Sequence, residues 1–94
     1  MLRISVKDEP NALHLKLEGK VAHPWTAELE AIWGRIVDGL ENRTLHLDLR
    51  GTTFVDRHGM QLLRTIVQAT NPVILADSPL TRQYAEQARQ AADA

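Results

Sequence analysis

The residues best suited to chemistry lie together at one expected strand-to-helix junction, Asp56-Arg57-His58-Gly59. Asp56 is a good N-cap, because its carboxylate can accept the unpaired N–H groups of a helix's first turn. A helix N-terminus carries roughly half a positive charge, so the cationic side chains of Arg57 and His58 stand where an anion is favoured. These backbone and side-chain donors could together receive a phosphate or a partner's carboxylate. The alternative is that Arg57 points to solvent, Asp56 is an ordinary cap and Gly59 only permits close packing.

Other polar residues give weaker signals. Thr52 and Thr53 could accept phosphate, although β-branched residues closing a strand explain them better. His14 and His46 occupy polar strand positions and could lie close together, with Asp48 nearby. Zinc sites bring three or four ligands at fixed spacings, and nothing here supplies a strong third. We therefore interpret the histidines as exposed strand residues and expect no metal site and no cofactor.

The sequence lacks required residues of the catalytic and phosphate-binding motifs with which we compared it. Gly19-Lys20 is similar to the end of a phosphate-binding loop, but His14 stands where glycine is required and Val21 where Ser or Thr would hold magnesium. No G-x-S-x-G elbow surrounds Ser5 or Ser78. The sequence therefore predicts a protein that is not an enzyme.

Composition limits the remaining classes. A chain of 94 residues is long enough for one domain, which we assign to residues 1–94. A net charge of −1 without a basic block argues against nucleic acid as a partner. The chain has no cysteine, which excludes disulfides and thiol catalysis. No apolar run suits a membrane span or a signal peptide, so we expect no membrane insertion and a cytoplasmic location.

Strict alternation of apolar and polar residues predicts most of the strands. Residues 2–7 and 12–18 alternate on either side of a turn at residues 8–11, which indicates a hairpin. Residues 44–50 alternate again, and Gly51-Thr52-Thr53 is expected to interrupt this strand before Phe54 and Val55. Val73 to Ala76 is a short, continuously apolar strand.

Three helices are expected between or after these strands. His23-Pro24 opens the first, because proline suits the first turn of a helix. Its apolar stripe comprises Leu29, Ile32, Trp33, Ile36, Val37 and Leu40. The second helix follows Asp56, ends at Asn71-Pro72, and buries Leu62, Leu63, Ile66, Val67 and Ala69. The third starts at Ser78-Pro79, with a stripe of Leu80, Tyr84, Ala88 and Ala91.

The order ββαβαβα predicts a mixed sheet, because strands joined through a helix are parallel and a hairpin is antiparallel. Three of the strands alternate, so one sheet face should lack a helical cover. We therefore predict an α/β fold of two layers, with the helices packed on one face. Trp33 should belong to the core. Trp25 is also assigned to the core, with a partly exposed interface anchor as the alternative.

Two stretches carry a family resemblance: residues 17–21 leading into 27–29, and residues 47–63, which read LDLRGTTFVDRHGMQLL. Together they resemble the STAS domain of sulfate transporters and anti-sigma factor antagonists, and the element order agrees over nearly the whole chain. In the phosphorylation-switched members, this loop carries a serine after the aspartate. Here Asp56 and Gly59 match the motif, whereas Arg57 replaces the phosphorylated serine. Control by serine phosphorylation is therefore not carried over to this chain.

The resemblance implies a regulatory module that docks to a protein partner, such as an anti-sigma factor or another signalling or transport protein. Residues 51–63 would form the docking region, with a contact set of Thr53, Asp56, Arg57, His58, Gly59 and Met60. Two alternatives remain open. One is a STAS subunit of a bacterial phospholipid-trafficking transporter, and the other is a STAS domain that binds a nucleotide or lipid.

Overall fold

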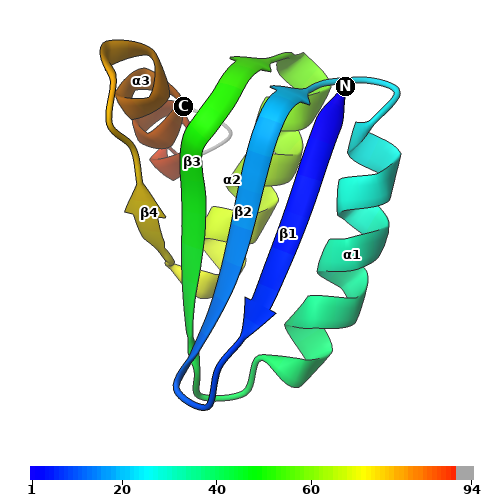
Figure 1. Ribbon diagram of the computed structural model, residues 1–94, viewed down its shortest axis with the longest axis vertical. Coiled ribbons are helices and arrows are strands. Elements are labelled where there is room, and N and C mark those ends of the chain that lie inside the picture. Colours follow the sequence, from blue (N-terminus) through cyan, green and yellow to red (C-terminus); the bar gives the residue numbers. More distant parts are fainter. Residues whose placement is uncertain (91–94) are drawn as a thin grey trace.

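The protein has one four-stranded sheet, which includes the N-terminal hairpin and carries the helices on one face. A computed structural model of the chain describes residues 1–90 (Figure 1). The strands lie in the order β1-β2-β3-β4, with β1 antiparallel to β2 and the other two pairs parallel. The predicted order and mixed sheet are confirmed. The elements are β1 (Leu2–Asp8), β2 (Ala12–Val21), α1 (Thr26–Gly39), β3 (Thr44–Val55), α2 (Arg57–Thr70), β4 (Val73–Leu75) and α3 (Pro79–Arg89).

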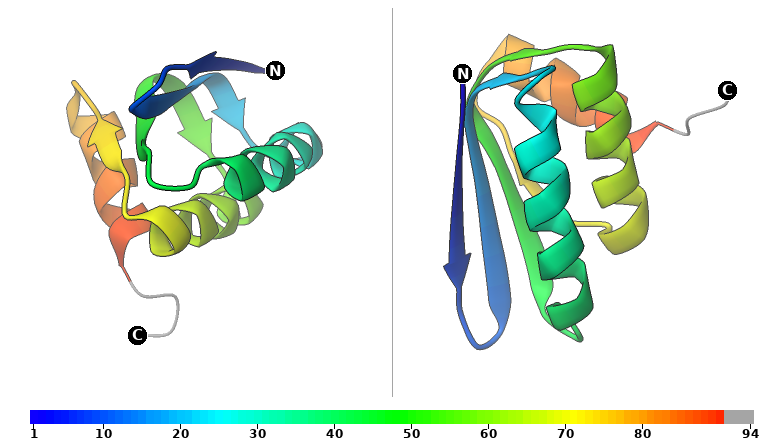
Figure 2. Two further views of the ribbon diagram at one scale, coloured as in Figure 1. Left: turned by 90° about the horizontal axis from the view of Figure 1, so that it is seen from below. Right: turned by 90° about the vertical axis from the view of Figure 1, so that its right-hand side faces the viewer.

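All three described helices lie on the same side of the sheet (Figure 2), where α2 and α3 pack against β3, and α1 and α3 lie on either side of α2. The alternation of the strands explains this arrangement, because every second side chain points to the helices. Their leucines are almost completely buried there: Leu13, Leu15, Leu17, Leu45, Leu47 and Leu49. The opposite face has no helical cover within residues 1–90. We call it the open sheet face, and it carries the polar residues of the alternation.

The second helix makes the best match between pattern and structure. Leu62, Leu63, Ile66 and Val67 are all buried, as predicted, whereas Ala69 is exposed. Asn71 ends the helix in the left-handed conformation, with φ of 47°. This conformation suits asparagine better than most residues, which explains the stop before Pro72. The helix is therefore held by its apolar stripe and by signals at both ends.

The first helix begins two residues later than predicted. Residues 22–25 form a turn, in which the N–H of Thr26 donates to the oxygen of Ala22 at 3.1 Å. His23 and Pro24 belong to this turn and therefore lie outside the helix. Trp33 is buried, as predicted. Trp25 directly precedes the helix, makes no capping hydrogen bond with its side chain, and is 36% exposed, so its assignment to the core was wrong.

The third strand is longer than predicted. It runs without interruption from Thr44 to Val55, and the expected break at residues 51–53 was wrong. Two shifts in the pairing with β2 place an extra residue in β3 each time, between Asp48 and Gly51 and between Thr52 and Phe54. Such bulges keep the strand paired while they bend and twist it. The polar and glycine residues therefore mark bulges and not the end of the strand.

The third helix shows a shifted buried face. Ser78 and Thr81 form a capping box, which fixes the predicted start at Ser78-Pro79. The buried residues are Thr81, Ala85 and Ala88, whereas Leu80 is 44% exposed. The predicted stripe was therefore wrong at Leu80, because Thr81 turns inward to close the capping box. Ala91 of that stripe lies outside the described residues.

Candidate functional site

The candidate site lies where the parallel strands end. The carboxyl ends of β2 and β3 meet at one edge of the sheet, next to the N-termini of α1 and α2 (Figure 1). In open α/β sheets, ligands bind preferentially at the carboxyl ends of the strands. Six exposed residues from this end are grouped here as the junction surface: His23, Trp25, Thr53, Phe54, Arg57 and His58.

Asp56 holds the two loops of the junction surface together. One carboxylate oxygen accepts the N–H of Gly59 at 2.7 Å, and the other accepts the N–H of His23 at 2.9 Å. Its own backbone N–H donates to the oxygen of Val21 at 3.2 Å. The predicted N-cap is confirmed, and the contact with His23 is an addition that the sequence did not reveal. The cap therefore also fixes the entry to α1.

Gly59 is buried where α2 crosses the end of β2. A Cβ atom at this position would lie 1.9 Å from the oxygen of Val21 and 2.9 Å from its carbonyl carbon. Only glycine permits this approach of two backbones. The side chain of Met60 is 8% exposed and packs in the core. Gly59 and Met60 thus stabilise the junction as buried residues, and neither has a side chain that a binding partner can contact.

Arg57 and His58 are the first two residues of α2, and both are exposed. The rings of His58 and His23 meet edge to face, with centroids 6.4 Å apart. Arg57 makes no ion pair among residues 1–90. The helix terminus therefore presents a free guanidinium and two imidazoles toward solvent, an arrangement that favours an acidic group.

The two threonines of the junction have different environments. Thr52 is buried, and its hydroxyl donates to the oxygen of Leu17 at 3.1 Å. That hydroxyl stabilises the bulged pairing of β2 and β3. Thr53 is exposed at the second bulge. Of the two hydroxyls, only that of Thr53 is open to a partner or a modifying enzyme.

Sequence reasoning did not include His23, Trp25 or Phe54 in the site. His23 enters through its backbone bond to Asp56, which no local pattern encodes. Phe54 is 47% exposed and Trp25 is 36% exposed, although both are large and apolar. Exposed aromatic residues of this kind are enriched at protein interfaces. The one available signal was Trp25, whose place before the apolar stripe allowed an interface role.

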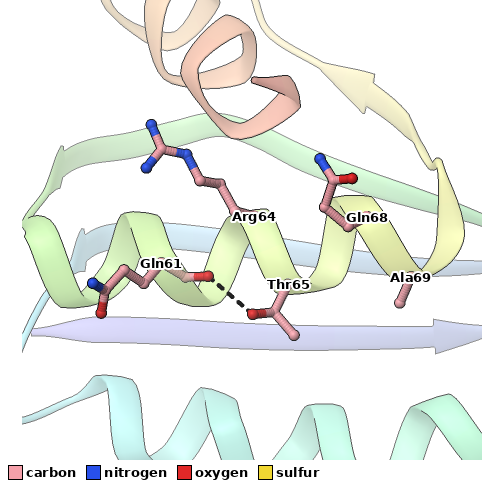
Figure 3. Close-up of a pocket in the computed structure, with 5 residues that line it drawn as sticks. All are labelled: Gln61, Arg64, Thr65, Gln68 and Ala69. Carbon is pink, nitrogen blue, oxygen red and sulfur yellow. Dashed lines mark hydrogen bonds between the residues drawn. The ribbon is translucent and has the colours of Figure 1, made fainter. Parts of the chain in front are cut away.

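Hollows continue from the junction surface along the outer side of α2. One of about 400 Å³ lies beside Asp56 and Arg57 and reaches α3. Another of about 570 Å³ follows the exposed side of α2, where Gln61, Arg64 and Gln68 project from successive turns (Figure 3). The guanidinium of Arg64 donates from Nε to the oxygen of Gln87 at 3.0 Å, which ties α2 to α3. These hollows therefore extend the junction surface along α2 toward α3.

The histidines on the open sheet face lie side by side. The rings of His14 and His46 stack with centroids 4.7 Å apart. Nε2 of His14 lies 2.7 Å from a carboxylate oxygen of Glu9. The predicted proximity of the two histidines is confirmed. Within residues 1–90 no group of three metal-binding side chains comes together.

Two aspartates have lowered pKa values. The side chain of Arg50 holds the pKa of Asp48 below its ordinary value, with further lowering from the Arg50 backbone N–H and the charges of Arg50 and Lys16. The N–H groups of Gly59 and His23 lower the pKa of Asp56, and the positive charges of His58 and His23 add to this. Both carboxylates are therefore ionised well below neutral pH.

These shifts predict a loss of stability in acid. Each pKa is lower in the folded chain than the ordinary value of 3.8, so each carboxylate's contribution is complete above that value and is lost as the pH falls through the folded pKa. Urea unfolding between pH 6 and pH 2.5 should show the free energy of unfolding falling below about pH 4. The variants Asp48→Asn and Asp56→Asn should each show a shallower decline. An unchanged decline in both variants would assign the acid sensitivity to other groups.

Comparison with known proteins identifies the fold. No protein-family model matches the sequence, and no curated protein sequence matches it significantly. Solved structures do match. An anti-sigma factor antagonist from Mycobacterium paratuberculosis has a TM-score of 0.77, with 19% identity over 92% of this chain and 76% of the other. The anti-sigma factor antagonist SpoIIAA in its unphosphorylated form has a TM-score of 0.68, with 14% identity over 92% and 82% of the two chains.

The chain has a STAS-like fold. A protein from Shewanella loihica with a SpoIIAA-like fold also matches, with a TM-score of 0.60 and 15% identity over 89% of this chain and 73% of the other. At these identities the likeness establishes the architecture of the STAS-like domain, which agrees with the predicted two-layer sheet. None of the three described helices has the length and apolar character that a membrane span requires.

Proposed function

We propose that this STAS-like domain is a regulatory module without enzymatic activity that docks to an acidic surface of a protein partner through the junction surface. The observation that carries the proposal is the exposed pair Arg57 and His58 at a helix start fixed by Asp56. Structural neighbours that are anti-sigma factor antagonists support a regulatory role for the same fold. A cytoplasmic location, as expected from the sequence, remains part of the proposal.

Each part of the junction surface has a distinct role in the proposed contact. Arg57 supplies a guanidinium that can bind a carboxylate through two hydrogen bonds. His58 and His23 add donors beside it. Trp25 and Phe54 supply apolar area, which contributes most of the affinity when such residues are covered by a partner. Thr53 contributes a hydroxyl at the edge of the surface.

Arg57 also replaces the serine that relatives with a phosphorylation switch carry at this position. A guanidinium cannot imitate a phosphate, because the two charges have opposite signs. We therefore infer that the contact is formed constitutively and is not switched at residue 57. An anti-sigma factor is the first candidate partner.

Charge reversal at Arg57 tests the proposal. Tagged wild-type protein, Arg57→Glu and the control Arg35→Glu are used to capture partners from a lysate of the source cells, and the affinity of the captured protein is then measured by calorimetry. Loss of a charged contact and gain of repulsion should weaken binding by about tenfold or more for Arg57→Glu. Arg35 is exposed on α1 away from the junction, so its reversal should leave affinity unchanged.

The identity of the captured protein separates the candidate partners. An anti-sigma factor would support the leading assignment, and a transporter ATPase subunit would assign the domain to lipid trafficking. Equal affinity of the wild type and Arg57→Glu would reject the junction surface as the docking site, whichever protein is captured.

A further inference from the structure

A third hollow lies on the open sheet face, away from the junction surface. Its volume is about 670 Å³, which is within the range of small-molecule sites. All four strands contribute to its lining, together with Glu9 from the hairpin turn. The lining residues are Ser5, Val6, Lys7, Glu9, His14, Lys16, Asp48, Arg50 and Leu75.

The floor of this hollow is an ordered ion pair between Asp48 and Arg50. Nε and one terminal nitrogen of Arg50 donate to the two oxygens of Asp48 at 3.0 and 2.9 Å. The backbone N–H of Arg50 adds a third bond at 3.0 Å. Asp48 is 7% exposed, whereas half of the Arg50 side chain is open to solvent. Since a guanidinium has five N–H donors, Arg50 keeps three that Asp48 does not use.

Lys16 places a second cation beside the same carboxylate. It lies directly opposite Asp48 in the pairing of β2 with β3. Residues opposite one another on a sheet face have Cβ atoms roughly 5 Å apart, so both cations flank one carboxylate. Lys16 has no ion pair among residues 1–90. Arg50 also lies in the field of Asp77, whereas Lys16 faces a carboxylate whose two oxygens both accept from Arg50.

The wall of the hollow does not supply an anion to Lys16. The carboxylate of Glu9 is engaged by Nε2 of His14 at 2.7 Å and by the ammonium of Lys7 at 3.8 Å. Ser5 lies opposite Lys16 on the other side, where its hydroxyl can donate to a ligand. Within the lining, Lys7, Lys16 and Arg50 outnumber Glu9 and Asp48 by one charge, while Asp77, outside the lining, acts on Arg50. The ammonium of Lys16 and the unused donors of Arg50 are therefore available to a small anion.

We propose that the hollow on the open sheet face binds a small carboxylate- or phosphate-bearing molecule, whose anionic group lies between Lys16 and the free donors of Arg50. Ser5 and Lys7 provide further donors, and Leu75 provides an apolar contact. A small molecule that fills this hollow would cover polar residues on the sheet face that no described helix covers. This site is independent of the junction surface and of the proposed protein partner.

NMR titration of the intact chain with citrate and, separately, with inorganic phosphate tests the proposal. We expect saturable shifts of backbone amides in residues 5–16 and 46–50 that weaken in Lys16→Gln, whereas any shifts at residues 53–59, where Arg57 and His58 also attract anions, should be the same in Lys16→Gln and the wild type. Lys16→Gln removes the unpaired cation without disturbing the Asp48–Arg50 pair, so it should weaken binding about tenfold. Lys20→Gln is the matched control, because Lys20 is also exposed on β2 but does not line the hollow.

The two anions distinguish the source of the ligand. Saturation by citrate alone assigns a carboxylate, saturation by phosphate alone assigns a phosphoryl group, and saturation by both supports their shared chemistry. Shifts that do not saturate, or an equal loss of affinity in Lys20→Gln and Lys16→Gln, would overturn the site and indicate ionic screening only.

Discussion

Gly59→Ala is expected to lower the free energy of unfolding by about 3 kcal/mol, because overpacking against rigid backbone leaves little room to relax. The added Cβ would lie 1.9 Å from the oxygen of Val21, so α2 must move away from the end of β2. That oxygen also accepts the N–H of Asp56, so the same movement strains the junction. Urea unfolding monitored by tryptophan fluorescence measures the effect.

Gly34→Ala provides the matched control for this prediction. Gly34 lies inside α1, and a Cβ at this position meets no atom within 4 Å. Alanine is favoured over glycine in a helix, so this variant should be more stable by about 1 kcal/mol. Effects of the same sign and size in both variants would contradict the close approach of α2 to β2.

Asp56→Ala is expected to cost about 2 kcal/mol of stability. Loss of an N-cap side chain costs about 1 kcal/mol, and the second bond to the N–H of His23 adds a similar amount. Both contacts are short, at 2.7 Å to Gly59 and 2.9 Å to His23. Chemical denaturation gives the stability, and amide exchange at Gly59 and His23 shows whether both bonds are lost.

Asp38→Ala separates this effect from the loss of a negative charge. Asp38 is exposed near the end of α1, and surface changes of this kind alter stability by less than about 0.5 kcal/mol. If Asp56→Ala were no more destabilising than Asp38→Ala, the carboxylate would not hold the two loops together.

The alternating strands and the apolar face of α2 were predictable because each depends on a short periodic pattern. Leu13, Leu15 and Leu17 follow a period of two, and the burial of all three follows from one covered face. The course of β3 was not predictable in the same way. The pairing with β2 keeps Gly51 in the strand although glycine has a weak strand preference. This pairing joins segments that are distant in the sequence, so no local pattern predicts it.

Some residues of the candidate site could also be predicted from the sequence, and others could not. Asp56, Arg57 and His58 could be located from the sequence, since a cap residue before an apolar stripe marks a helix start. The part played by His23 could not be predicted from the sequence, because it depends on a hydrogen bond to Asp56, which lies 33 positions away in the chain. Trp25 was misassigned because an aromatic residue beside a helix start suits the core as well as an interface, and only the turn at residues 22–25 decides between them.

Hydrogen–deuterium exchange of the chain with and without its captured partner tests the central claim most directly. Docking through the junction surface predicts slower exchange at residues 22–26 and 53–61, with residues 13–17, in the half of β2 away from the junction, unchanged. Protection confined to the open sheet face or to α3, with residues 53–61 exchanging as in the free protein, would contradict the claim.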